Sequence, residues 1–166
     1  AETPPASSIL TVSTTTPIAG AAEAVAAVMP GVAQIAVTSA GGTTDASAVV
    51  IRADGYLVTD AAVVAEAETI TVSLADGTVE AGEVVAVDRV SELAVIRVPR
   101  TDLTPVRLGD PAELQVGQQA MALGSHQDGG PSISSGVISA LDQRSTSEAG
   151  TALYGMIRFD APVPPE

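Results

Sequence analysis

The sequence predicts an all-β fold. From residue 32 onward, short apolar runs are broken by turn residues every eight to twelve positions or so, a spacing typical of β-sandwiches and barrels. Hydrophobic residues make up 46% of the 166 residues and aromatic residues only 2%, so the core must be filled by valine, isoleucine, leucine and alanine. Because β-branched side chains pack well on pleated sheets, this composition favours strands over helices.

The N-terminal part predicts an arm followed by one short helix. Residues 1–20 are rich in threonine, serine and proline, which predicts a flexible arm. Residues 21–29 are rich in alanine and end before a proline and a glycine, which predicts a short helix. Its apolar face carries Val25, Val28 and Met29.

Six predicted strands follow the helix. They span residues 32–38, 46–52, 56–59, 69–74, 78–87 and 93–98. Glycine-containing turns separate several of them, and the Asp-Gly pairs in two of these turns are strong hairpin signals. Residues 60–66 are predicted to interrupt the series as a helical turn. We therefore expect residues 21–100 to form the helix and a first, closed antiparallel barrel.

Residues 101–166 predict a linker and a partial second barrel. Residues 101–108 are interpreted as a connection. Three strands are predicted beyond it, at residues 119–123, 132–141 and 153–159, with a polar loop at 142–150. Three strands are too few to close a barrel, so the second barrel is predicted to be incomplete.

The charge excludes several classes of partner. The chain has 20 acidic residues against seven arginines and no lysine, which gives a formal net charge of -13. Such a surface repels phosphate backbones and anionic headgroups, so we expect no nucleic acid and no direct membrane contact. Cysteine is absent, which excludes disulfides, thiolate metal sites and a cysteine nucleophile. No cofactor and no metal site are expected.

An ordered set of segments resembles the motifs of trypsin-like (chymotrypsin-fold) serine proteases of the HtrA-like branch. Residues 55–64, GYLVTDAAVV, resemble GYILTNAHVV, the segment that carries the catalytic histidine in that branch. Further similar segments are residues 49–56 (VVIRADGY), 72–77 (VSLADG), 88–95 (DRVSELAV), 108–118 (LGDPAELQVGQ), 122–125 (ALGS) and 134–140 (SSGVISA). The resemblance implies two perpendicular β-barrels with an active site in the cleft between them.

The same resemblance implies that the catalytic machinery is degenerate. The histidine position falls on Ala62, which has no proton acceptor, and the carboxylate position falls on Glu92, which lengthens the arm. The serine would follow residues 159–165 and is expected beyond Glu166. Since the family's chemistry needs a serine activated by histidine and backbone donors for the oxyanion, we predict no catalytic residue in this chain and an inactive, C-terminally incomplete homologue.

His126, the only histidine, lies in the glycine-rich segment 124–130 with Ser125 and Asp128. Adjacent loop residues cannot converge as a triad requires, so a solvent-exposed histidine is favoured over a catalytic one. A metal site made by His126 with Asp128 would need further ligands. Without a lysine, the segment is not a phosphate-binding loop.

Two pairs of acidic residues are further candidates. Glu66 with Glu68, or Glu80 with Glu83, could form a carboxylate pair for glycoside chemistry. Close spacing on a strand is more typical of a solvated face, which is the favoured interpretation.

These observations lead to three hypotheses of function. The first is a non-catalytic pseudoprotease module that binds a protein or peptide in the extracytoplasmic space of a bacterium, in the cleft or along a strand edge. The second is a fragment of an HtrA-like endopeptidase whose nucleophile lies beyond Glu166, and the third is a structural spacer. The linker-like start at Ala1 predicts a processed product, secreted or anchored upstream. A second copy or a C-terminal complementing segment would complete the second barrel.

Overall fold

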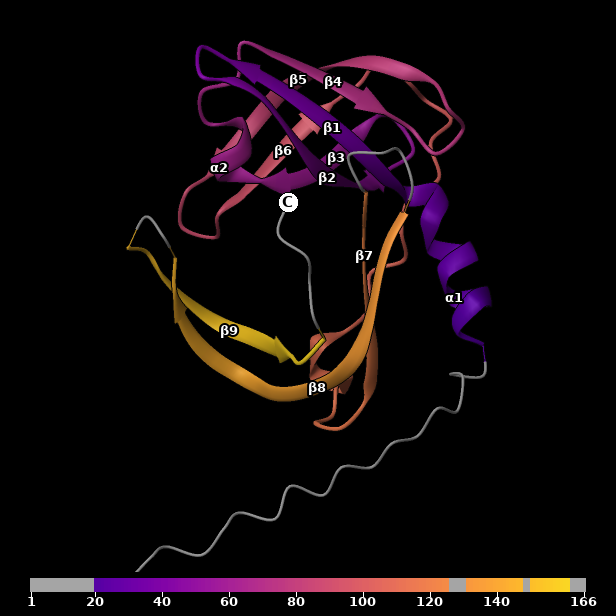
Figure 1. Ribbon diagram of the computed structural model, residues 1–166, viewed down its shortest axis with the longest axis vertical. Helices are drawn as coiled ribbons and strands as arrows, with labels where there is room; N and C mark the ends of the chain where they lie inside the picture. Colours follow the sequence, from indigo (N-terminus) through magenta and orange to yellow (C-terminus); the bar gives the residue numbers. More distant parts are fainter. Residues whose placement is uncertain (1–19, 126–130, 148–149, 162–166) are drawn as a thin grey trace, which may run out of the picture.

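The fold consists of a closed β-barrel and a curved three-stranded sheet, and the barrel lies above the sheet in Figure 1. The computed structural model describes residues 20–125, 131–147 and 150–161. The predicted arm, apart from Gly20, and the segment around His126 therefore lie outside the described residues. The prediction of a mostly β fold with a short N-terminal helix, a closed first barrel and an incomplete second one is confirmed.

The N-terminal helix, α1, spans Ala21–Val28 and continues as a 3₁₀ turn, η1, over Met29–Gly31. Pro30 has no N–H to donate to a carbonyl four residues back, so the α-helix ends before it. Val25 and Val28 are half-buried, as the predicted apolar face requires, but no residue of α1 is fully buried. Within the described residues, no helix combines the length and the apolar character that crossing a membrane requires.

Six antiparallel strands close the first barrel. They are β1 (Val32–Ser39), β2 (Gly42–Arg52), β3 (Tyr56–Asp60), β4 (Thr69–Ser73), β5 (Val79–Asp88) and β6 (Leu93–Arg97), in the order β1-β2-β3-β6-β5-β4. β1 pairs with both β2 and β4, which joins the first strand to the last and closes the sheet. The short helix α2, Ala61–Val64, connects β3 to β4, where a helical turn was predicted.

The barrel core is built from aliphatic side chains alone. Alternate residues of β1 to β4 and of β6 are buried, whereas β5 has no buried residue. The largest fully buried side chains are Ile35, Leu57, Ile96, Val50, Val72 and Val98. Medium-sized, β-branched side chains fill a six-stranded barrel without aromatic rings, which agrees with the low aromatic content. Thr59 is the buried polar exception among the described residues, and its hydroxyl donates to the Ser47 carbonyl at 2.9 Å.

Two strands are longer than predicted by four residues or more. β2 begins at Gly42 instead of residue 46, because its polar start pairs with the end of β1 down to the Ser39–Gly42 register. β8 continues to Thr146, so the predicted polar loop at 142–150 is wrong over its first half. Pairing with β9 supplies backbone hydrogen bonds there, and three register shifts along β8 accommodate the polar residues.

Gly55 allows the chain to cross closely over the turn between β2 and β3. Its φ is +98°, and a Cβ at this position would collide with the Val98 carbonyl and lie 2.9 Å from the Arg100 carbonyl oxygen. The Val98 N–H donates to the Gly55 carbonyl at 2.9 Å. Only glycine accepts both the backbone conformation and the close approach.

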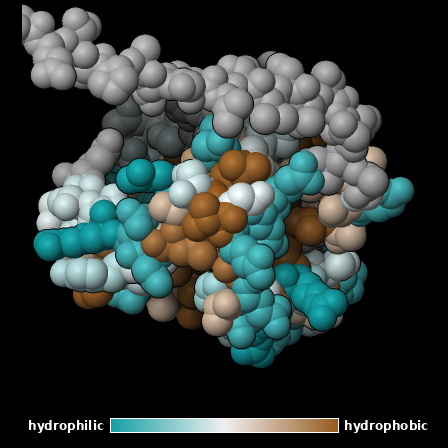
Figure 2. Space-filling model, turned by 90° about the horizontal axis from the view of Figure 1, so that it is seen from below, coloured by the Kyte–Doolittle hydropathy of each residue, from teal (hydrophilic) through white to brown (hydrophobic). Residues whose placement is uncertain are grey.

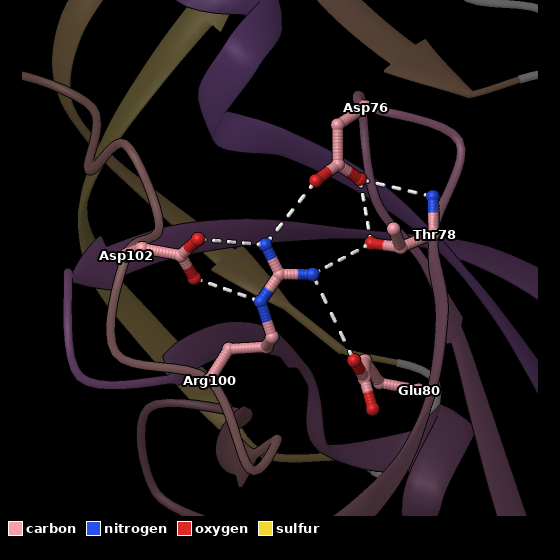
Figure 3. Close-up of polar contacts among 5 residues, drawn as sticks. All are labelled: Asp76, Thr78, Glu80, Arg100 and Asp102. Carbon is pink, nitrogen blue, oxygen red and sulfur yellow. Dashed lines mark hydrogen bonds and ion pairs between the residues drawn. The ribbon is translucent and has the colours of Figure 1, made fainter.

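A cluster of charged residues around Arg100 fixes the start of the connection between the two sheets (Figure 3). Arg100 Nε donates to Asp102 at 2.8 Å, Nη1 donates to the Thr78 hydroxyl at 2.9 Å, and Nη2 lies 3.3 Å from Asp76. Glu80 is 3.7 Å from the same guanidinium. The connection is thereby held against the hairpin between β4 and β5.

The second sheet contains β7 (Gln119–Ser125), β8 (Pro131–Thr146) and β9 (Ala152–Phe159), with β8 in the middle. A 3₁₀ turn, η2 (Pro111–Glu113), precedes it. The sheet does not close, and Ile138 is its only buried hydrophobic residue among those described. Figure 2, seen from below, shows apolar side chains gathered in the middle of this end of the molecule. Exposed hydrophobic residues of β8 and β9 are Ile133, Tyr154, Met156 and Ile157.

Candidate functional site

The helix α2 carries Ala62 at the rim of the first barrel. The Asp60 carboxylate accepts a hydrogen bond from the Ala62 N–H at 2.6 Å and so caps the first turn. The Ala61 N–H donates to the Glu92 carbonyl at 3.0 Å. This backbone hydrogen bond ties α2 to the residue that precedes β6, so positions 62 and 92 lie close together although 30 residues separate them.

Glu92 is held in an unusual backbone conformation. Its φ is +57°, in the left-handed region that residues other than glycine rarely adopt. The preceding turn is rigid, because the Asp88 carboxylate accepts from the Val90 N–H at 2.9 Å and from the Ser91 hydroxyl at 2.8 Å. These two hydrogen bonds hold the pKa of Asp88 below its ordinary value. Glu92 is half-buried, whereas the turn itself is exposed.

Ala62 and Glu92 line the same pocket, which has a volume of about 750 Å³. Its walls come from β1, β2, α2, the end of β5 and the turn before β6, and one residue comes from the segment that leads into β9. The lining residues are Val37, Ser39, Thr44, Ala61, Ala62, Val63, Ala65, Glu66, Val87, Arg89, Glu92 and Thr151. The pocket thus lies between the barrel and the second sheet.

The pocket offers hydroxyls, carboxylates and alkyl groups. Ser39, Thr44 and Thr151 supply hydroxyls, and no histidine is among the described lining residues. Within the described part of the chain, the side chains of Glu66, Glu92 and Arg89 form no ion pair. Their charges are therefore available to an occupant. Across the same described residues, no group of three or more histidine, cysteine, aspartate or glutamate side chains could hold a metal ion.

The structure brings together some of the predicted residues and separates others. Glu66 and Glu92 line the same pocket, but Glu68 does not line it. Glu80 faces Arg100 instead, and Glu83 is exposed on β5, as expected for a solvated face.

Sequence reasoning missed several pocket residues. Val87 reaches the pocket from the end of β5, Arg89 from the turn that follows β5, and Thr151 from the segment that leads into β9. The Asp-x-x-Ser turn that precedes Glu92 was the local signal for the first two. Thr151 had no signal, because only the packing of the two sheets brings it there.

The trypsin-like peptidase domain family matches residues 46–165, which is more than half of the sequence. The chain belongs to this family. The chain is similar to relatives and solved structures of the HtrA and DegP type, which agrees with the HtrA-like motifs in its sequence. The predicted resemblance is therefore confirmed.

Two curated relatives illustrate the similarity. The putative serine protease HhoB of Synechocystis sp. is 38% identical over 104 residues, which cover 63% of this chain and 25% of that protein. A probable periplasmic serine endoprotease, DegP-like, of Halomonas elongata is 40% identical over 97 residues, which cover 58% of this chain and 20% of that protein. The chain therefore matches only a quarter or less of the length of these relatives.

Solved structures of the family have the same fold. The HtrA-type protease AlgW with decapeptide has a TM-score of 0.74 at 25% identity and covers 87% of this chain and 52% of that one. The crystal structure of Deg5 has a TM-score of 0.74 at 29% identity and covers 86% and 73%. The HtrA-type trypsin-like fold thus extends over most of this chain.

Proposed function

We propose that this domain is a non-catalytic pseudoprotease module that binds a peptide or protein segment. The observation that carries the proposal is the pocket in which Ala62 and Glu92 meet. By the motif resemblance, Ala62 occupies the position of the catalytic histidine. A methyl group neither accepts nor shuttles a proton, so general-base activation of a serine hydroxyl has no agent at this position.

Glu92 supports the same proposal. A triad aspartate orients the imidazole and stabilises its cation. Glu92 has an extra methylene and a left-handed backbone, and the described residues offer it no imidazole partner. This backbone conformation costs about 1 kcal/mol or more, and proteins keep such strain where the surrounding structure imposes it. In a binding module, this half-buried carboxylate serves recognition instead of catalysis.

Peptide binding follows from the shape of the site and from the open sheet. The pocket is large enough to accept an amino-acid side chain. Among the described residues β9 pairs only with β8, so its outer edge offers backbone groups to an extended segment. HtrA-type protease AlgW is described in structures with a tripeptide and with a decapeptide, which supports the same kind of ligand here. A structural spacer would not require such a pocket.

An extracytoplasmic location is part of the proposal. Several relatives are named as periplasmic proteases. The chain's acidic surface and its lack of cysteine fit a protein segment as ligand and disfavour nucleic acid.

The alternative function is that of a protease fragment, and it is favoured by the names of the two relatives above, both of which are described as proteases. The Ala62→His variant distinguishes the two. In the full-length protein, we expect Ala62→His to leave casein hydrolysis and fluorophosphonate labelling at background, because catalysis requires sub-ångström placement that Glu92 does not provide. Labelling of a serine in either the natural protein or this variant would establish the protease instead.

A further inference from the structure

The walls of the pocket and its charges point to a particular kind of side chain. Alkyl groups from Val37, Ala62, Val63 and Val87 form much of the lining. They suit the methylene stem of a long side chain. A purely apolar occupant would fill this space but would leave the charged groups of the pocket without partners.

Glu92 makes the charge of the occupant important. Its side chain is already half-buried, and among the described residues it has no ion-pair partner. An occupant that covers it removes more of its water, which is costly unless the occupant supplies a cation or hydrogen-bond donors. Glu66 adds a second carboxylate to the same lining.

Arg89 is the only cationic side chain among the described lining residues, so the two carboxylates leave the pocket with a net charge of -1. The whole chain carries -13. Both the local and the overall potential therefore attract a cation and repel an anion.

We infer that the pocket accepts a basic side chain, lysine or arginine, presented by an extended peptide segment. The stem packs on the valine and alanine side chains, and the ammonium or guanidinium group pairs with Glu92 and Glu66. This inference rests on the proposed peptide-binding function and adds the chemistry of the ligand to it.

Two peptides that differ only in charge test the inference. The probes are the N-acetylated, C-amidated pentapeptide Ala-Ala-Lys-Ala-Ala and the same peptide with norleucine in place of lysine, which keeps the alkyl stem and removes the charge. Binding to the full-length protein is followed by amide NMR shifts, and we expect the shifts at Ala62, Arg89 and Glu92. The lysine peptide should bind about fivefold more tightly, the upper range for one partly exposed ion pair.

Charge variants of the pocket should change this preference in opposite directions. Glu92→Gln is expected to weaken lysine-peptide binding about three- to fivefold and to leave norleucine-peptide binding unchanged. Arg89→Gln should strengthen lysine-peptide binding, because it removes a repulsion. Glu68→Gln is the matched control, since it changes the net charge equally but lies outside the pocket, and it should have no effect. Unchanged amide dispersion confirms that each variant is folded.

The possible failures are distinguishable. Equal binding of the lysine and norleucine peptides, or equal effects of Glu92→Gln and Glu68→Gln, would overturn the inference and leave peptide binding intact. Absence of shifts with both peptides would count against the proposed function as well. Shifts confined to β9 would also overturn the inference, because they would place the ligand on the sheet edge.

Discussion

At the scale of single residues, Gly55 and Gly77 have similar backbones in different surroundings. Both have positive φ, +98° and +82°, but only Gly55 has carbonyl oxygens where a Cβ would lie. We expect Gly77→Ala to cost about 1 kcal/mol for the left-handed conformation alone. Gly55→Ala should cost about 3 kcal/mol, because the crossing segment must also move. Urea unfolding followed by circular dichroism measures both values.

Gly77→Ala serves as the control for Gly55→Ala. If the two variants lost the same stability, the close approach of Val98 and Arg100 to Gly55 would not contribute to the cost of the Gly55→Ala substitution. The fixed crossing of the connection over the barrel would then need another cause.

At the scale of elements, the helix α2 depends on its cap. Asp60→Ala removes the acceptor for the Ala62 N–H, and we expect it to lower the free energy of unfolding by about 1 kcal/mol. Asp60→Asn keeps an acceptor and should lose only a few tenths. Thermal or urea unfolding distinguishes them. A loss as large for Asp60→Asn as for Asp60→Ala would mean that charge, not capping, stabilises this turn.

The cluster around Arg100 should make the connection between the sheets sensitive to acid. The guanidinium lowers the pKa of Asp102 below its ordinary value, and the Thr78 hydroxyl and N–H, with Arg100, lower the pKa of Asp76. A carboxylate with a lowered pKa stabilises the fold above its unfolded pKa, and the contribution is lost as pH falls through the folded value. The stability difference between the natural protein and Arg100→Gln should therefore be full at pH 5 to 7 and shrink below about pH 3.8.

Arg52→Gln is the control for Arg100→Gln. It removes an exposed ion pair with Asp54 and a cation–π contact at 4.8 Å with the Tyr56 ring. The substitution should change stability little at any pH, because both kinds of interaction contribute little at exposed sites. Urea midpoints at pH 7, 5 and 3 give the comparison. A constant difference between the natural protein and Arg100→Gln over this range would show that the cluster acts through packing instead of charge.

The sequence predicted strands well where apolar runs are bounded by turn residues and poorly where a strand is polar. All six barrel strands were located, because each contains an apolar run and turn residues separate the runs. Buried residues alternate with less buried ones in five of the strands, whereas β5 has no buried residue. The polar start of β2 and the polar end of β8 were missed, since their pairing depends on a neighbouring strand and not on an apolar pattern.

The candidate site was predictable only in part. Ala62 and Glu92 were found through motif resemblance, and their proximity in the structure depends on the hydrogen bond between Ala61 and Glu92. Thr151 could not be found, because no local pattern reports which surfaces of two packed lobes face each other.

At the scale of the whole molecule, stability should be distributed unequally. Nearly all the buried hydrophobic residues belong to the first barrel and its flanks, while Ile138 alone among the described residues represents the second sheet. We expect hydrogen exchange to be slow for amides of β1 to β6 and several orders of magnitude faster for β9. Amides exchange when the structure opens locally, and opening is rarer where more apolar contacts are buried. Mass spectrometry of peptic fragments measures this.

Equal protection of β9 and the barrel would show that something covers the second sheet in solution. A second copy of the chain predicts protection that rises with protein concentration. A complementing segment of the same protein predicts protection that does not depend on concentration.

Closure of the first barrel also limits where a strand of another molecule can pair with the protein. A closed sheet has no free edge, so β1 to β6 offer no template for adding a further strand. Strand exchange, domain swapping and fibrous aggregation therefore have access only through β7 and β9 in the described part of the chain. The same edges serve recognition and expose the molecule to unwanted assembly, so a substitution such as lysine on the outer edge of β9 would reduce both together.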